Sequence, residues 1–270
     1  MKFLFVFLII LTSCGAKETG IKSDIKNNVE EYKKSAISSY MKGDTDTALN
    51  YLSQSLEMAY KVDSVKQIVE INNLVAEIYI NSGDIISASN YIFNAYNIEK
   101  VEGRNFSFDT MLNIARLWMK LYEKTQSNFY LEKSKEAFNV AEKSIKSDEE
   151  RARYYNNYGK LMLKIMNYEK ALDFFLKALK LCENKKNFLV TADSYYNIGR
   201  VYEEKKSYEK AIENYKKSLE NDKLVENTRG IYLNLKKIGT LYEKLGNTEL
   251  SEYYLSKAKK ISSLYKSEEF

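Results

Sequence analysis

The chain has 270 residues, a formal net charge of +5, two cysteines, no proline and no histidine. The lack of histidine excludes catalytic triads with an imidazole base and most zinc sites, and neither cysteine belongs to a CxxC pair, so nothing favours a metal or cofactor. Lys and Glu are interleaved along the chain, which is typical of solvated helix surfaces and not of a nucleic-acid-binding face. Absent proline and plentiful aromatic residues predict a nearly all-helical, well-packed protein.

The first 13 residues have the composition of a secretory signal peptide. Lys2 provides one positive charge, and an apolar run follows from Phe3 to Leu11. That run is much shorter than the roughly 20 residues that span a bilayer. The pattern therefore predicts a cleaved leader over residues 1–13.

The four residues Leu11, Thr12, Ser13 and Cys14 resemble the bacterial lipobox. The resemblance implies cleavage before Cys14, lipids on that cysteine and a lipidated tether over residues 14–23. It also implies a lipid-anchored protein of the bacterial cell envelope. Gly15 follows where an Asp would retain an enteric-type lipoprotein at the inner membrane, which favours the outer membrane if the organism is Gram-negative. The alternative is an ordinary secretory signal with a chance cysteine.

Residues 24–270 carry one helical pattern that repeats with a period of about 40 residues. Each period holds two small residues, usually 12 positions apart, and turn-forming Gly, Asp, Asn or Ser lies between them. Such a period indicates a solenoid of helix pairs. The small residues of the first helices are Ala36, Ala76, Ala115, Gly159, Gly199 and Gly239, and those of the second helices are Ala48, Ala88, Ser134, Ala171, Ala211 and Ser251.

The third repeat departs from this spacing. Ala115 and Ser134 lie 19 positions apart instead of 12. Two interpretations remain open: residues 124–128 form a longer turn, or the first helix runs on past Tyr122.

The pattern resembles the tetratricopeptide repeat family. The fifth repeat carries the family's large, small and aromatic positions at Tyr195, Ile198, Gly199, Tyr202, Tyr208, Ala211, Tyr215 and Ser218. The resemblance covers about residues 24 to 262, although the family's closing proline is missing and the period is longer than its usual 34. It implies an all-α, right-handed solenoid of about six helix pairs, with helices about a turn longer and the first helices lining a concave face.

One polar position of the first helices suggests a binding site. Asn113, Asn157 and Asn197 lie two residues before the small residue of consecutive repeats, so they should form a ladder whose amides could clamp the backbone of an extended peptide. The alternative is that they are solvated polar residues. Cations beside them would favour an acidic segment or a C-terminal carboxylate. The predicted partner-binding residues of this face are Asn113, Arg116, Asn157, Lys160, Asn197, Arg200 and Lys237.

Together these features predict a membrane-anchored scaffold that binds a protein or peptide partner in a bacterial envelope complex. The resemblance leaves one alternative, a helical-repeat lipoprotein that passes a small molecule to a transporter. An apolar pocket would favour the alternative, and an open polar groove would count against it. We expect no enzyme activity, no cofactor and no nucleic-acid partner.

Overall fold

The computed structural model describes residues 24–182 and 185–265. The predicted signal peptide (1–13) and lipidated tether (14–23), with Cys14, lie outside the described residues. Within the described ranges no helix has both the length and the apolarity needed to cross a membrane. A helical segment over residues 24–41 is followed by α2 (Thr45–Lys61), α3 (Val65–Ser82), α4 (Ile85–Val101), α5 (Phe108–Thr125), α6 (Asn128–Lys143), α7 (Asp148–Lys164), α8 (Tyr168–Cys182), α9 (Phe188–Glu204), α10 (Tyr208–Leu224), α11 (Thr228–Lys244) and α12 (Thr248–Tyr265).

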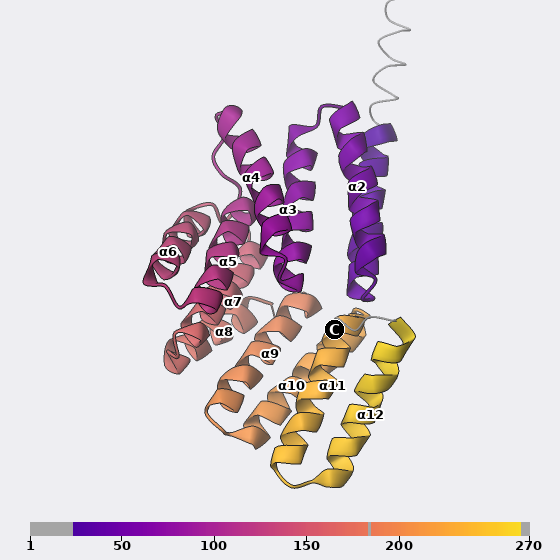
Figure 1. Ribbon diagram of the computed structural model, residues 1–270, viewed down its shortest axis with the longest axis vertical. Helices are drawn as coiled ribbons and strands as arrows, with labels where there is room; N and C mark the ends of the chain where they lie inside the picture. The colour runs from indigo at the N-terminus through magenta and orange to yellow at the C-terminus, as the bar shows by residue number, and fades with distance from the viewer. Residues whose placement is uncertain (1–23, 183–184, 266–270) are drawn as a thin grey trace, which may run out of the picture.

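These helices form six successive hairpins that stack side by side, which confirms the predicted all-α solenoid of six helix pairs (Figure 1). We number the repeats 1 to 6 in chain order. Repeat 1 pairs residues 24–41 with α2, and the others pair α3 with α4, α5 with α6, α7 with α8, α9 with α10, and α11 with α12.

Each hairpin turn needs a residue in the left-handed region. Gly83 ends α3 at φ +86°, and the side chain of the next residue, Asp84, accepts a hydrogen bond from the main-chain N–H of Ser87 at the start of α4. Glycine adopts this conformation without steric cost, and the aspartate satisfies a helix N–H that has no partner within the helix. In repeats 4 and 5 Met166 and Lys206 adopt the same conformation, at φ 59° and 58°.

The predicted small residues lie where the two helices of a repeat touch. A Cβ atom added at Gly199 would lie 2.9 Å from the ring of Tyr215 in α10, and one at Gly159 would lie 2.6 Å from the ring of Phe175 in α8. Both rings are fully buried. The register read from the sequence is therefore correct in these repeats.

The structure decides between the two interpretations of the longer spacing between Ala115 and Ser134 in the third repeat. Helix α5 runs past Tyr122 to Thr125, and the turn is only residues 126–127, so the helix extension is the correct interpretation. Helix α5 also begins seven residues before Ala115, whereas α7 begins eleven residues before Gly159. Measured from these small residues, α5 is thus shifted by one turn, about 6 Å along its axis.

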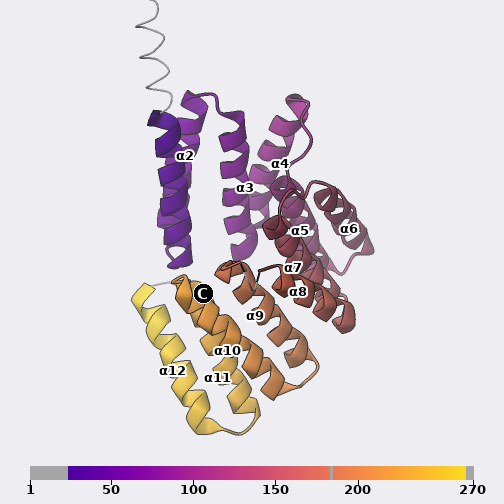
Figure 2. The same ribbon diagram turned by 180° about the vertical axis from the view of Figure 1, so that it is seen from behind.

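The array curves until its first repeat meets its last ones. In Figures 1 and 2 the indigo end of residues 24–41 lies against the orange turn between α10 and α11. Tyr40 and Arg229 make this contact: Nη1 of Arg229 donates to the Tyr40 hydroxyl at 2.9 Å, across 189 positions of sequence.

Candidate partner-binding face

The first helices form the inner row of the curved array. Direct contacts join α3 to α5, α5 to α7 and α7 to α9, whereas no comparable contact joins two second helices of the described chain. In a curved stack the inner row is the more crowded one. The polar sides of the first helices therefore line the concave face, as predicted.

The three predicted asparagines lie on these helices but are not open to the groove. Asn113, Asn157 and Asn197 are at most 9% exposed. The Asn113 amide donates to the Asn73 carbonyl at 3.0 Å, the Asn197 amide to the Asp193 carbonyl at 2.6 Å, and the Asn157 amide to the carbonyl four residues before it at 2.8 Å. The expectation of open amides is wrong, because these amides donate to main-chain carbonyls of the first helices.

Two of the asparagines instead position arginines of the concave face. Arg116 donates to Oδ1 of Asn113 at 3.2 Å, and Arg200 donates to Oδ1 of Asn197 at the same distance. The predicted neighbourhood of these pairs, one helical turn apart, is correct. A direct role of the asparagines in partner binding stays a prediction.

Ion pairs between consecutive first helices cover the concave face, and every junction between repeats has at least one. They involve three of the four predicted cations, Arg116, Lys160 and Lys237. The pairs are Lys33–Glu70 (2.6 Å), Arg116–Glu77 (3.1 Å), Arg153–Asp109 (2.8 Å), Lys164–Glu123, Lys160–Asp193 (2.9 Å) and Lys237–Glu203 (3.0 Å).

The electrostatics of this row are set by an excess of positive charge. Burial alone would raise the pKa of Glu77, but Arg116, Arg153 and Lys160 together hold that pKa below its usual value. Glu203 has a second role, since it also accepts a hydrogen bond of 2.6 Å from the hydroxyl of the core residue Tyr215. The concave charges are therefore fixed both to one another and to the core.

Two concave cations, one in repeat 3 and one in repeat 5, remain poorly compensated. Arg200 has no carboxylate partner among the described residues, and Lys120 reaches only Glu123, at 4.0 Å, which Lys164 already engages. Burial lowers the pKa of Lys120, and the cations Lys164, Arg116 and Arg200 add to the effect although Glu123 opposes it. This part of the face offers positive charge to an incoming anion.

Sequence reasoning missed Lys120, Lys164 and the pairing of the concave cations with carboxylates of the neighbouring repeat. A usable signal was present, because the paired charges lie 33 to 41 positions apart in five of these six pairs, close to one repeat period. Opposite charges one period apart on first helices are neighbours across a repeat junction.

A hollow of about 510 Å³ lies elsewhere, between α6 and the α7–α8 pair. It is found beside the axially shifted third repeat, where α6 packs only sparsely on α7. Four of its eight lining residues are apolar or aromatic and the other four are charged or polar, so it is not the apolar pocket that would favour transfer of a small molecule. The lining residues are Lys135, Tyr158, Met162, Ile165, Asn167, Lys170, Asp173 and Phe174.

Comparison with known proteins supports the fold. Residues 150–223 match the family model of the tetratricopeptide repeat. A Rap protein complexed with Competence and Sporulation Factor has a similar structure, with a TM-score of 0.60, 16% identity, and coverage of 92% of this chain and 79% of that one. BtubC (BKLC) from P. vanneervenii has a TM-score of 0.55, 19% identity, and coverage of 88% and 92%. The thermophilic tetratricopeptide-repeat protein TTC0263 from Thermus thermophilus also has a TM-score of 0.55, with 17% identity and coverage of 75% and 97%. No curated protein matches the sequence.

Proposed function

Because this chain is a tetratricopeptide-repeat protein, we propose that it is a non-catalytic scaffold that binds a protein or peptide partner on its concave face. The solved Rap protein supports the proposal, since it has a similar fold and is complexed with Competence and Sporulation Factor. We propose further that the scaffold works in a bacterial envelope complex, attached to the membrane by lipids on Cys14.

The observation that carries the proposal is the poorly compensated positive charge of the concave face. Arg200, held by Asn197, has no carboxylate partner among the described residues, and Lys120 lies near three other cations. A partner that brings a carboxylate gains a charge-assisted hydrogen bond without first breaking an ion pair. The face therefore favours an acidic segment or a C-terminal carboxylate.

The same lining disfavours transfer of an apolar small molecule from the concave face. Its ion pairs and guanidinium groups would lose hydration against an apolar ligand without regaining a partner. A polar face that runs across several repeats suits an extended chain better.

Crosslinking in intact cells, followed by capture of the full chain and mass spectrometry, tests the binding proposal. Arg200→Glu reverses the uncompensated charge, and Lys180→Glu makes the same change on an exposed position of the second helix α8. We expect one envelope protein to be recovered with wild type and Lys180→Glu and lost with Arg200→Glu. Equal recovery with all three would contradict binding at the concave face.

Membrane fractionation tests the anchor separately. If Cys14 carries lipids, Cys14→Ser moves the protein from the membrane to the soluble fraction or leaves it unprocessed. A serine variant that is processed and still partitions with membranes would refute the lipid anchor, whatever the capture experiment shows.

A further inference from the structure

The contact between the first repeat and the α10–α11 turn closes the solenoid into a ring. The Tyr40 hydroxyl accepts a hydrogen bond from Arg229 at 2.9 Å, and the guanidinium group lies over the Tyr40 ring, 5.5 Å from its centre. A cation above an aromatic face adds electrostatic attraction to the hydrogen bond. We call this contact, together with the residues that surround it, the seam.

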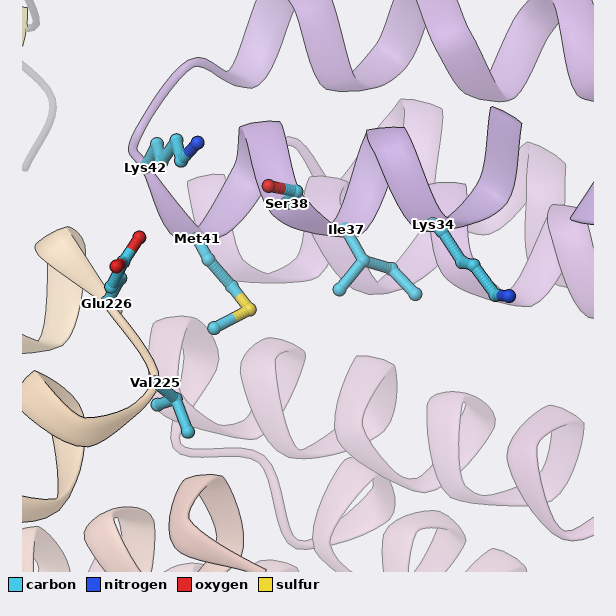
Figure 3. A pocket seen from close by; sticks show the side chains of 7 residues that line it. All are labelled: Lys34, Ile37, Ser38, Met41, Lys42, Val225 and Glu226. Atoms are coloured by element: carbon cyan, nitrogen blue, oxygen red, sulfur yellow. The ribbon is translucent and has the colours of Figure 1, made fainter. Parts of the chain in front are cut away.

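The seam is much more loosely packed than the junctions between consecutive repeats. Figure 3 shows Ile37 and Met41 on the helix of the first repeat, Val225 and Glu226 on the facing α10–α11 turn, and a gap between the two segments that all four residues line. The gap is a cavity of about 270 Å³, and Ile37 remains 43% exposed. Apolar groups that do not touch contribute little attraction.

No buried apolar cluster of the described residues crosses the seam. The cluster of repeats 1 and 2 contains fully buried side chains such as Leu52 and Ile71, and the cluster of repeats 5 and 6 contains Tyr215 and Ile238. Each cluster stays on its own side. The seam is therefore held by polar contacts at its edge, and each side has a buried apolar cluster of its own, as is expected of an element that can adopt two arrangements.

A chain of hydrogen bonds ties the seam to the concave face. The Tyr40 hydroxyl also accepts from the Asn81 amide, at 3.0 Å. The side-chain oxygen Oδ1 of Asn81 in turn accepts a hydrogen bond from Arg116 at 2.7 Å. Arg116 is the concave cation that pairs with Glu77. Arg116 is only 8% exposed, so its guanidinium group has few other positions to adopt.

We propose that the seam is a gate to the concave face, that Tyr40 and Arg229 close it, and that Arg116 controls its closure through Asn81. This inference rests on the proposed function, since it concerns access to the proposed binding face. An anionic group at the exposed edge of Arg116 needs to shift the guanidinium group only slightly to weaken its bond to Oδ1 of Asn81, and the Asn81 amide is then no longer held in place as a donor to Tyr40. Occupancy then favours the open ring, and by reciprocity the open ring favours occupancy.

The distance across the seam in the full chain, without partner, tests the proposal. Nitroxide labels at Asp46→Cys and Lys223→Cys, two exposed positions on opposite sides, report it by pulsed electron resonance in a Cys14→Ser, Cys182→Ala background. We expect Arg229→Ala to lengthen the mean distance and broaden its distribution. Arg116→Gln and Asn81→Ala should change the distance in the same direction by a smaller amount.

The matched control is Lys160→Gln. Lys160 is also a concave cation with an ion pair, to Asp193, but it has no bond in the chain that leads to Tyr40. We expect its distance distribution to match wild type. Asn81 is exposed at the end of α3, so Asn81→Ala breaks the relay without a buried vacancy.

An unchanged distance in Arg229→Ala would overturn the gate. A changed distance in Arg229→Ala but not in Arg116→Gln or Asn81→Ala would overturn control by Arg116, as would an equal change in Lys160→Gln. These distance measurements need no partner. The capture experiment can therefore contradict binding at the concave face while the distances support the gate, and the distances can contradict the gate while capture supports binding.

Discussion

The first three and the last three repeats solve the same packing problem with different residues. Where the two helices of a repeat touch, repeats 1 to 3 have alanine and repeats 4 to 6 have glycine. Ala76 packs in one cluster with Ile92, whereas Gly199 lies under the ring of Tyr215. In repeats 4 and 5 the missing methyl group makes room for the ring of Phe175 or Tyr215, whereas Gly239 of repeat 6 faces Leu255.

The comparison shows that the small residue and its partner act as a unit. A methyl group at Gly199 would lie 2.9 Å from an aromatic ring that cannot move, because Tyr215 is fully buried and its hydroxyl is bonded to Glu203. Ala76 already has its methyl group, and Ile92 packs against it. The alanine and glycine repeats are therefore not interchangeable one residue at a time.

Gly199→Leu should have the largest effect. Four added carbon atoms must displace Tyr215 or separate α9 from α10, and overpacking of this kind costs about 3 kcal/mol. Urea unfolding of the full chain measures the loss, and Glu220→Leu, which places the same side chain on the exposed side of α10, is the control. Equal stability of Gly199→Leu and wild type would mean that the register described here is wrong.

The two halves also differ in a buried acidic residue, and this difference predicts that stability depends on pH. The residue is Glu99 in repeat 2 and Asp222 in repeat 5, in each case eleven positions after the small residue of the second helix. Burial raises the pKa of Asp222 to about 7, with Asp193 adding to it, although hydrogen bonds from Asn227 and Asn234 oppose the shift.

The folded chain therefore holds the Asp222 proton up to about pH 7, whereas the unfolded chain releases it near pH 4. The contribution of this group is fully present below about pH 4 and is lost as pH rises to about 7, by up to a few kcal/mol. Asp222→Asn should lose less stability over this range than wild type, as measured by urea midpoints at several pH values. Parallel curves for the two proteins would rule out the titration of Asp222 as the cause.

Ala76→Gly should have the smallest effect of the three. Glycine inside a helix and the lost methyl contact with Ile92 together cost about 1 to 2 kcal/mol. The same unfolding measurement applies. A gain in stability would show that repeat 2 accepts glycine at position 76 although Ile92 is its partner. The alanine and glycine repeats would then be interchangeable at this position.

Much of the fold could be predicted because one period fixes many positions at once. The six small residues of the first helices placed the helix pairs correctly, since tight contacts tolerate few residue types. Ring closure could not be predicted, because the curvature adds a small rotation at each junction and only the sum decides whether Tyr40 meets Arg229. The third repeat was ambiguous because a spacing of 19 fits a longer helix as well as a longer turn.

The concave face was predicted less well than the fold. Its position and Arg116, Lys160, Arg200 and Lys237 could be read from the helical period, but the burial of the asparagines could not. Asn113 and Asn197 are polar in sequence, and only the structure shows that their amides bond to nearby carbonyls. The poor compensation of Arg200 likewise depends on which carboxylates are near it.

Ring closure also bears on how the array unfolds. A linear stack of repeats frays from its ends, because each terminal repeat has one neighbour and the stability is a sum over adjacent pairs. Here the bond between Tyr40 and Arg229 gives the first repeat a second neighbour. With the seam closed, every contact between neighbouring repeats is part of one ring. Unfolding of the first repeat then breaks two interfaces instead of one.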